Sequence, residues 1–197
     1  MALRGHLGSA PAAPLILAST SPQRRAILTQ LRVPFEVVAP SFEEIDGTSP
    51  LERARGKAHS VDGRDLPVLG VDTEVLFDGE LLGKPGDETE AERMLERLSG
   101  RTHEVVSGLC LRTHAWEELH ESVTHVRFRE LTPRDLGHYV ASREWEGRAG
   151  AYAIQGLGAS LVETIDGDFL NVVGLPGSLL VRLLATRPRR FSTRGCR

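Results

Sequence analysis

Short apolar runs alternate with helix-like patterns along most of the chain. Three runs of strand length are bounded by polar residues, glycine or proline, and this predicts strands. They cover residues 15–18, 35–38 and 67–71. Two longer segments, 102–112 and 118–130, alternate apolar with polar residues. This alternation predicts two long paired strands.

Two aspartate-glycine pairs predict hairpin turns, because both residues tolerate the positive φ angles of tight turns. The pairs are Asp78-Gly79 within residues 75–82, and Asp166-Gly167 between residues 159–165 and 169–173. We expect the strand over 67–71 to end at Asp72-Thr73, with a separate hairpin following it.

Capping residues mark the predicted helix starts. Three sites place serine or threonine before a proline of the first turn, and two of them have an acidic residue three positions after the cap. They are Ser21-Pro22, Ser49-Pro50-Leu51-Glu52 and Thr132-Pro133-Arg134-Asp135. The predicted helices follow Ser21 and cover residues 50–61, 87–98, 132–141 and 176–185, and residues 144–158 form a glycine-rich loop. Early helical crossovers and later long antiparallel strands predict an α/β fold with a mixed, elongated central sheet flanked by helices.

The length of 197 residues and the apolar fraction of 40% suit one domain with a substantial core. We expect that domain over residues 14–186, as two lobes around a cleft, between a flexible tail over 1–13 and a basic tail over 187–197. The formal net charge of −3 gives no general attraction to nucleic acid, although the arginines of the second tail leave that contact open. No apolar segment approaches 18 residues, so no membrane span is expected and a cytoplasmic protein is the default.

The composition contains two lysines, Lys57 and Lys84, against twenty-two arginines. An ammonium is a compact point charge, whereas a guanidinium is a planar fork, so a site crowded with phosphate oxygens can require lysine. Biased codon usage with two surface lysines is the alternative.

The segment Ser19–Arg25 joins a predicted buried strand to a helix start. A helix N-terminus with hydroxyls and arginines beside it forms an anion site, typically for phosphate, and here Ser19, Ser21, Gln23 and Arg24 supply the polar side chains. The sequence has neither a P-loop nor a dinucleotide-binding glycine motif. A well-capped helix with surface arginines is the alternative.

Asp72 follows an apolar strand, at the position where open α/β sheets bind ligands. Its carboxylate can accept a proton from water, ligate a divalent cation or cap a turn. Glu44 lies in an acidic cluster after the second strand, and with Asp72 it can hold Mg²⁺ against substrate phosphates. In the glycine-rich loop, Gln155 offers an amide that can read a base edge.

Together these segments resemble the Maf family of nucleotide pyrophosphatases. Six short motifs in the family's order carry the resemblance. They are Leu-Ala-Ser-Thr-Ser-Pro-x-Arg at 17–24, Ala-x-x-Lys-Ala at 54–58, Gly-x-Asp-Thr at 70–73 with Gly-Lys-Pro at 83–85, Ala-Gly-Ala-Tyr-x-Ile-Gln-Gly at 149–156, and Val-Val-Gly-Leu-Pro at 172–176. The resemblance implies a fold similar to the inosine triphosphate pyrophosphatases, a homodimer, and hydrolysis of a nucleoside triphosphate to a monophosphate and pyrophosphate with Mg²⁺ or Mn²⁺.

The resemblance also assigns expected roles. Asp72 matches the family's proton acceptor; Ser21, Arg24, Glu44, Lys57, Lys84 and Gln155 match positions near phosphate, metal or base. Thr73 and Gln155 resemble the branch that prefers dTTP and UTP, whereas Gln23 departs from it, because that branch usually has arginine there. We therefore expect attack of water on the α-phosphorus of a pyrimidine triphosphate. The alternatives are a 7-methyl-GTP pyrophosphatase, an inosine or xanthosine triphosphate pyrophosphatase, and a non-hydrolytic nucleotide-binding regulator of cell division.

Overall fold

The computed structural model describes residues 14–43, 45 and 47–186. One mixed sheet has the strand order β2-β1-β3-β5-β6-β7, and β4 pairs with the outer part of β3. The strands are β1 (Leu15–Ala18), β2 (Phe35–Val38), β3 (Val68–Phe77), β4 (Glu80–Leu82), β5 (Thr102–Arg112), β6 (Glu117–Phe128) and β7 (Val162–Asp166). The helices are α1 (Pro22–Gln30), α2 (Pro50–His59), α3 (Glu88–Leu98), α4 (Pro133–Ala141), α5 (Phe169–Val173) and α6 (Gly177–Thr186), with 3₁₀ turns η1 (Ala149–Ala151) and η2 (Gly156–Leu161).

The sheet changes direction at β3. On one side β1 runs parallel to β2 and β3, and on the other side β3, β5, β6 and β7 pair antiparallel. This confirms the predicted mixed α/β sheet. Strand β1 is short and pairs only with Val68 and Leu69 of β3, so the same edge of β3 extends well beyond the end of β1.

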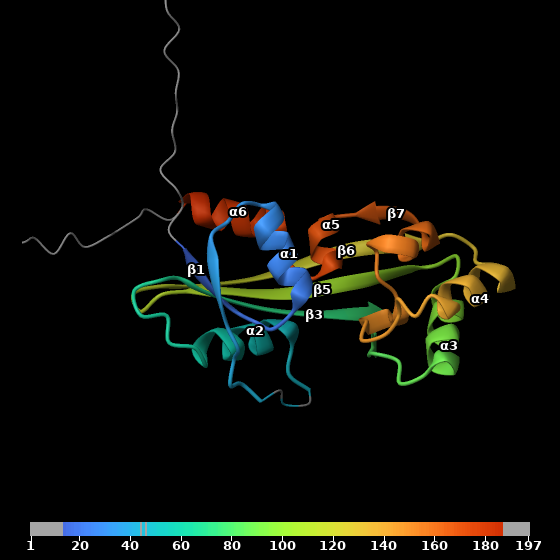
Figure 1. Cartoon of the computed structure of the whole chain (residues 1–197), viewed down its shortest axis with the longest axis horizontal. Helices are drawn as coiled ribbons and strands as arrows, with labels where there is room; N and C mark the ends of the chain where they lie inside the picture. The colour runs from blue at the N-terminus through green and yellow to red at the C-terminus, as the bar shows by residue number, and fades with distance from the viewer. Residues whose placement is uncertain (1–13, 44, 46, 187–197) are drawn as a thin grey trace, which may run out of the picture.

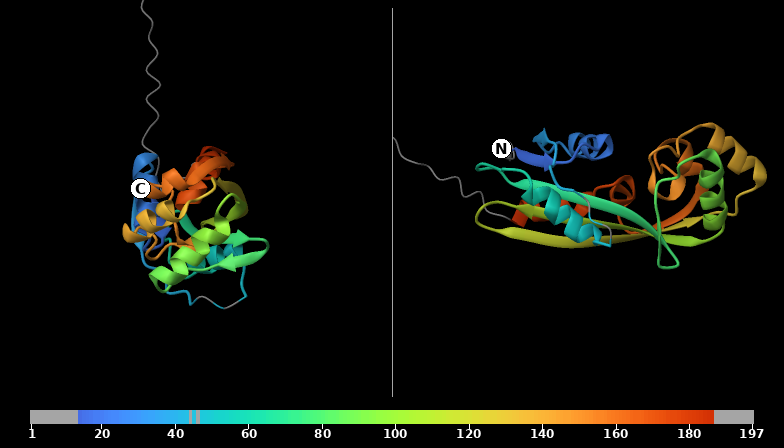
Figure 2. Two further views of the ribbon diagram at one scale, coloured as in Figure 1. Left: turned by 90° about the vertical axis from the view of Figure 1, so that its right-hand side faces the viewer. Right: turned by 90° about the horizontal axis from the view of Figure 1, so that it is seen from below.

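Helices cover both faces of the sheet and one of its ends (Figure 1). Helices α1 and α6 lie on one face, α2 lies on the other, and α3 and α4 lie together at the far end. Seen from below, the long strands β5 and β6 run the length of the molecule between these two groups of helices (Figure 2, right). The molecule is therefore elongated along the strands.

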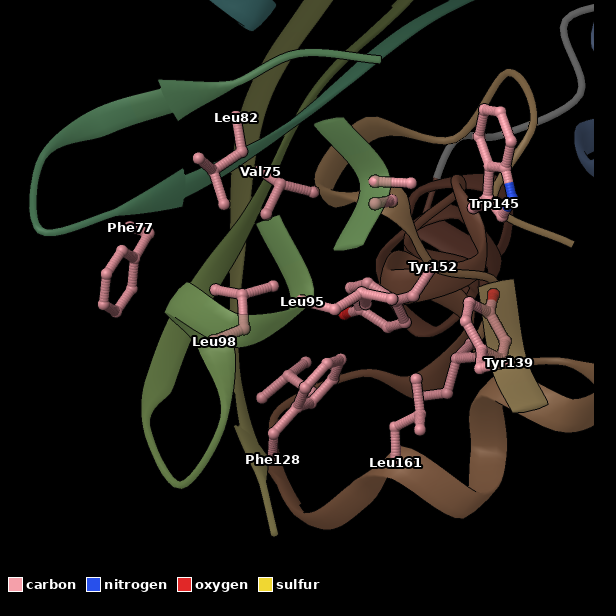
Figure 3. Close-up of a cluster of buried hydrophobic side chains, with 14 of the residues drawn as sticks. Val75, Phe77, Leu82, Leu95, Leu98, Phe128, Tyr139, Trp145, Tyr152 and Leu161 are labelled. Carbon is pink, nitrogen blue, oxygen red and sulfur yellow. The ribbon is translucent and has the colours of Figure 1, made fainter. Parts of the chain in front are cut away.

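Buried side chains form three separate clusters. The far-end core joins α3 and α4 to the outer halves of β3, β5 and β6, and Figure 3 shows Tyr152 in it beside Leu95, Phe128 and Tyr139. The α1–α6 core fills one face of the sheet and contains Leu17, and the α2 core fills the opposite face. Cys110 belongs to the α2 core, where burial raises the pKa of its thiol to about 12.

Two strand glycines let α2 lie directly on the sheet backbone. A Cβ atom on Gly70 would come within 2.1 Å of the Ala54 carbonyl oxygen, and one on Gly108 within 2.4 Å of Leu51 Cα. Ala54 and Ala58 are fully buried on the contacting face of the helix. The helix itself begins with a capping box in which Ser49 accepts from Glu52 N–H at 3.2 Å. This close packing sets the height of the α2 side chains above β3.

The prediction that a strand ends at Asp72-Thr73 is wrong. Strand β3 continues to Phe77 because β5 pairs with it without interruption, with Asp72 opposite Gly108. The hairpin at Asp78-Gly79 is confirmed, with positive φ angles at both residues. Asp72 still lies just beyond the carboxyl end of the parallel neighbour β1. It therefore stands at the kind of strand end where a ligand site was predicted, although the strand that ends there is β1 and not β3.

The prediction of a strand over 169–173 is also wrong, because this segment is the short helix α5. Asp168 caps it by accepting from Leu170 N–H at 2.8 Å. The Asn171 amide donates to Val105 O at 2.9 Å and ties the helix to the sheet. The cap and this buried contact outweigh the strand propensity of the two valines. Strand β7 pairs with β6 instead, and residues 156–161 form the turn η2.

The other predicted strands and helices are confirmed within a few residues at their ends. The predicted tails, residues 1–13 and 187–197, lie outside the described residues, as does Cys196. None of the helices in the described part of the chain is long and apolar enough to cross a membrane.

Candidate functional site

A cleft of about 860 Å³ opens where β1 ends beside β3. Its walls are the segment leading into α1, one side of α2, the middle of β3, the loop after β4, the loop before η1 and the turn after α5. These segments are far apart in the chain, between Ser19 and Gly174. The α1–α6 and α2 cores border the cleft on one side and the far-end core on the other.

Basic side chains of α2 pair with acidic side chains of β3 on one wall of this cleft. Lys57 Nζ contacts Asp72 Oδ1, and Arg53 Nε donates to Asp72 Oδ2 at 2.7 Å. Arg53 Nη2 also donates to Glu74 Oε2 at 2.6 Å. Burial lowers the pKa of Arg53, but its hydrogen bonds to the two carboxylates raise the pKa more, so it lies above its usual value.

Arg24 fixes the segment before α1 against the sheet and the turn after α5. Its Nε donates to Gly174 O at 2.9 Å, and its Nη1 and Nη2 donate to Ser19 Oγ at 3.2 Å and Thr73 Oγ1 at 3.4 Å. Thr73 Oγ1 lies 2.8 Å from Ser107 Oγ. Thr73 and Asp72 are successive strand residues and point to opposite faces of the sheet. The cleft therefore reaches both faces around the exposed edge of β3.

Gln23 and Arg148 meet across the cleft. When the Gln23 amide is turned so that both neighbours are satisfied, its oxygen accepts from Arg148 Nη2 at 2.8 Å and its nitrogen donates to Ser21 Oγ at 3.0 Å. Ser21 also caps α1 by accepting from the Arg24 N–H at 3.4 Å. The helix N-terminus and a cation of the opposite wall are thus joined through one side chain.

Lys84 lies in the loop after β4 and lines the same cleft with its exposed side chain. Gly150 N–H donates to Gly83 O at 3.1 Å and ties this loop to the one that carries Arg148. Gly150 has a φ of 70°, a conformation that glycine adopts without strain. The two cations therefore lie on one wall, facing Arg24 and the start of α1.

The structure brings most of the predicted site residues together in this cleft. Those that line it are Ser19, Ser21, Gln23, Arg24, Lys57, Asp72, Thr73 and Lys84. Glu44 lies outside the described residues. Gln155 is exposed and is not among the described residues that line the cleft. Glu144 accepts from Leu157 N–H at 3.2 Å and holds the turn that carries Gln155 away from the cleft.

Sequence reasoning missed Arg53 and Glu74 and drew nothing from Arg148. Arg53 precedes Lys57 by four residues, which places both on one face of a helix. Glu74 follows Asp72 by two residues, which places both on one face of a strand. These two spacings were visible in the sequence, but the prediction that β3 ends at Asp72 concealed the second one.

The carboxylates of the site fit a divalent cation that is held jointly with phosphates. The described residues contain no group of three or more histidine, cysteine or acidic side chains placed to hold a metal ion. Magnesium, however, usually takes one or two carboxylates and completes its oxygen shell with substrate phosphates and water. Asp72 is a largely buried carboxylate on the cleft wall, with a side-chain exposure of 11%, and it can supply one such oxygen ligand when Lys57 moves off Oδ1.

Three comparisons relate this chain to known proteins. The family model described as "Maf-like protein" matches residues 14–187. The chain is 44% identical to the dTTP/UTP pyrophosphatase of Bacillus velezensis over 86% of this chain and 94% of that protein. It is 46% identical to the dTTP/UTP pyrophosphatase of Gloeobacter violaceus (89% and 97%) and 47% identical to that of Thermococcus onnurineus (86% and 95%).

A solved structure, that of a HAM1 protein from Coxiella burnetii, aligns with 58% of this chain and 72% of its own at 19% identity. The TM-score is 0.43.

Proposed function

The chain belongs to the Maf family, and from this premise we propose that it hydrolyses a nucleoside triphosphate to the monophosphate and pyrophosphate. Relatives from Bacillus velezensis, Gloeobacter violaceus and Thermococcus onnurineus carry the name dTTP/UTP pyrophosphatase, and the match covers nearly their whole length. We propose dTTP and UTP as the substrates on this basis. The reaction breaks the bond between the α-phosphorus and the bridging oxygen, and water supplies the new oxygen.

One observation carries the proposal: Arg24, Lys57, Lys84 and Asp72 line a single cleft although they come from four different segments. A triphosphate carries several negative charges along a short chain, and cations placed along it stabilise the charge that develops on the leaving pyrophosphate. A helix N-terminus, here that of α1, adds N–H groups and a partial positive charge.

Asp72 is the carboxylate that we propose to act on the attacking water. It is buried to 8% exposure on β3, and Lys57 and Arg53 hold its two oxygens in place. A fixed carboxylate beside the α-phosphorus can take a proton from water in the transition state. Pyrophosphate then leaves along the wall that carries Lys84.

We propose that a divalent cation, Mg²⁺ or Mn²⁺, binds together with the substrate phosphates; Asp72, as the alternative to its role as proton acceptor, and Glu44 are the candidate ligands from the sequence. When bound, such a cation neutralises phosphate charge and orients water. Cationic side chains of the chain itself, among them Arg24, Lys57 and Lys84, supply the remaining positive charge.

We assign the base-proximal end of the cleft to Thr73 and Gln23. Arg24 holds Thr73 from the α1 side, and Arg148 holds Gln23 from the opposite wall. Both side chains keep polar atoms at the surface of the cleft, so they can hydrogen-bond to a base edge or a sugar. Gln155 lies outside the cleft, so it can contact the base only if the loop that carries it moves toward the cleft.

The first experiment measures pyrophosphate and monophosphate release from dTTP, UTP, 7-methyl-GTP, ITP and XTP with Mg²⁺ or Mn²⁺. We expect the highest kcat/KM for dTTP or UTP. Asp72→Asn should lower turnover at least ~100-fold, the low end of general-base effects. Asp166→Asn is the matched control, since Asp166 is exposed on β7 outside the cleft.

Tight binding of a triphosphate without product would instead support the nucleotide-binding regulator. Preference for 7-methyl-GTP, ITP or XTP would keep the reaction and overturn the proposed base. Near-normal turnover of Asp72→Asn would remove Asp72 from the reaction. The homodimer implied by the resemblance and the cytoplasmic location expected from the apolar pattern stay predictions.

A further inference from the structure

We propose that Arg53 is a positioning residue for Asp72 and that Glu74 holds Arg53 in place. The inference rests on the proposed hydrolysis and assigns two further residues to the same site. Neither residue belongs to the motifs on which the family resemblance was based. The role follows from the arrangement of four charged side chains at the interface of α2 and β3.

Arg53 is held by three acceptors at once. Its Nε donates to Asp72 Oδ2 at 2.7 Å, its Nη2 donates to Glu74 Oε2 at 2.6 Å, and its Nη1 donates to the Thr48 carbonyl. A guanidinium presents its donors in a rigid planar fork, so contacts on three nitrogens fix its plane as well as its position. The Asp72 oxygen that it contacts is therefore fixed relative to the helix.

The four side chains balance each other in charge. Helix α2 contributes the cations Arg53 and Lys57 at a spacing of four residues, and β3 contributes the anions Asp72 and Glu74 at a spacing of two. Their side-chain exposures range from 11% to 16%. Charges so far removed from water are stable only when they are paired. Glu74 therefore supplies the charge that allows Arg53 to remain beside Asp72.

The two cations that contact Asp72 differ in how firmly they are held. Arg53 has a second carboxylate and a backbone carbonyl as anchors, both of which belong to the protein. Lys57 is a flexible side chain that lines the cleft, and incoming phosphate oxygens compete with Asp72 Oδ1 for its ammonium. When Lys57 turns to the phosphates, Arg53 keeps Oδ2, so Asp72 presents Oδ1 to the substrate without losing its orientation.

The location of Glu74 separates this role from a purely structural ion pair. Arg53, Lys57, Asp72 and Glu74 all line the cleft, and none of them belongs to the three apolar cores. A pair that only supported the fold would affect stability. A pair that orients Asp72 must affect the rate of the chemical step, because a small misplacement of a reacting group lowers turnover strongly.

The test is a double-mutant cycle on the full chain with Arg53→Met, Glu74→Gln and the double variant. We measure kcat and KM for the triphosphate that the wild type turns over best. Arg53→Met should lower kcat about 10- to 100-fold and change KM less than about threefold, because orientation is lost while phosphate binding remains. Glu74→Gln should lower kcat less. The double variant should match Arg53→Met, because Glu74 acts through Arg53.

Two further variants test whether the geometry of the Arg53 guanidinium matters beyond its positive charge, and whether any arginine substitution on α2 lowers kcat. Arg53→Lys keeps the positive charge but lacks the planar fork that holds Asp72, Glu74 and the Thr48 carbonyl in one geometry, so it should stay as impaired as Arg53→Met within about threefold. Arg55→Met is the matched control. Arg55 lies on the same helix, is 56% exposed and pairs with Glu117 outside the cleft, so its kcat should equal that of the wild type.

A kcat of Arg53→Met near the wild-type value would overturn the inference. So would a Glu74→Gln substitution that lowers kcat by the same factor in the wild type and in Arg53→Met. Full rescue by Arg53→Lys would show that charge alone is needed and would also overturn it. A crystal structure of Arg53→Met provides a readout that is independent of turnover. Unchanged Asp72 side-chain torsions there would refute the positioning role, even if the proposed hydrolysis itself failed.

Discussion

Three buried rings meet in the far-end core, and one of them is the imidazole of a histidine. His103 has an exposure of 1%, its Nε2 lies 2.8 Å from Tyr152 Oη, and its ring meets Phe128 and Tyr152 edge to face at 5.1 and 5.3 Å. Burial lowers the pKa of His103 to about 4, against 6.5 for an unburied histidine. The native protein therefore keeps this imidazole neutral in mildly acidic solution.

This histidine makes stability depend on pH. The unfolded chain takes up a proton near pH 6.5 and the folded chain only near pH 4, so the contribution is complete above pH 6.5 and is lost as the pH falls toward 4. The loss is on the order of 3 kcal/mol, from about 1.4 kcal/mol per pKa unit. Urea unfolding between pH 4.5 and 7 should show that the free energy of unfolding falls as the pH is lowered, and His103→Phe should reduce this slope.

The control for this measurement is His138→Gln, because His138 is exposed on α4. That variant should keep the wild-type slope. An equal slope in His103→Phe and wild type would assign the acid sensitivity to other groups.

At the scale of elements, the placement of α2 decides where the charged side chains of the site stand. Its contact with the sheet passes over Gly70 and Gly108, where the nearest atoms are backbone atoms of the helix. Backbone cannot move aside as a flexible side chain can, so a methyl group there must displace the whole helix. Arg53 and Lys57 would move with it.

Gly108→Ala should therefore destabilise the protein by about 1–3 kcal/mol, the usual cost of overpacking, and lower turnover as well. Urea unfolding and kcat/KM measure the two effects. Gly137→Ala is the matched control. Gly137 lies in α4 with open space around its Cα, so alanine should stabilise the helix by roughly 0.5–1 kcal/mol and leave turnover unchanged. A Gly108→Ala variant as stable and active as wild type would refute this account of the packing.

At the scale of the whole molecule, the cleft lies between separate cores that the long strands connect. The contact between Gln23 and Arg148 joins its two walls directly. A triphosphate that contacts Arg24 on one wall and Lys84 on the other would join them again. A ligand that binds the folded state but not the unfolded state raises the free energy of unfolding, and well above the Kd this increase grows with the logarithm of the ligand concentration.

A non-hydrolysable dTTP analogue should consequently raise the melting temperature. At a hundred times its Kd the expected stabilisation is about 2.7 kcal/mol. Lys84→Met should need a higher analogue concentration for the same shift. Arg127→Met should respond as the wild type, because Arg127 pairs with Glu163 on the exposed side of β6. A shift that is unaffected by Lys84→Met would place the nucleotide elsewhere.

The local sequence determined most elements and much of the chemistry. Capping boxes at Ser49 and Thr132 fix helix starts through contacts within four residues, so they can be predicted without knowledge of the fold. The turn at Asp78-Gly79 is equally local. The grouping of Arg24, Lys57 and Asp72 in one cleft was predicted from residue types that suit phosphate binding at strand and helix ends, although Lys57 lies in the last turn of α2 and Asp72 in the middle of β3.

Only the tertiary structure decided the rest, because those features depend on residues far apart in the chain. The continuation of β3 past Asp72 depends on pairing with β5, which begins more than twenty residues later. The helix at 169–173 depends on Asn171 reaching Val105. The bridge from Arg53 to Glu74 requires α2 to lie on a glycine surface that two different strands provide. Local propensity carries no information about such partners, and packing alone determines them.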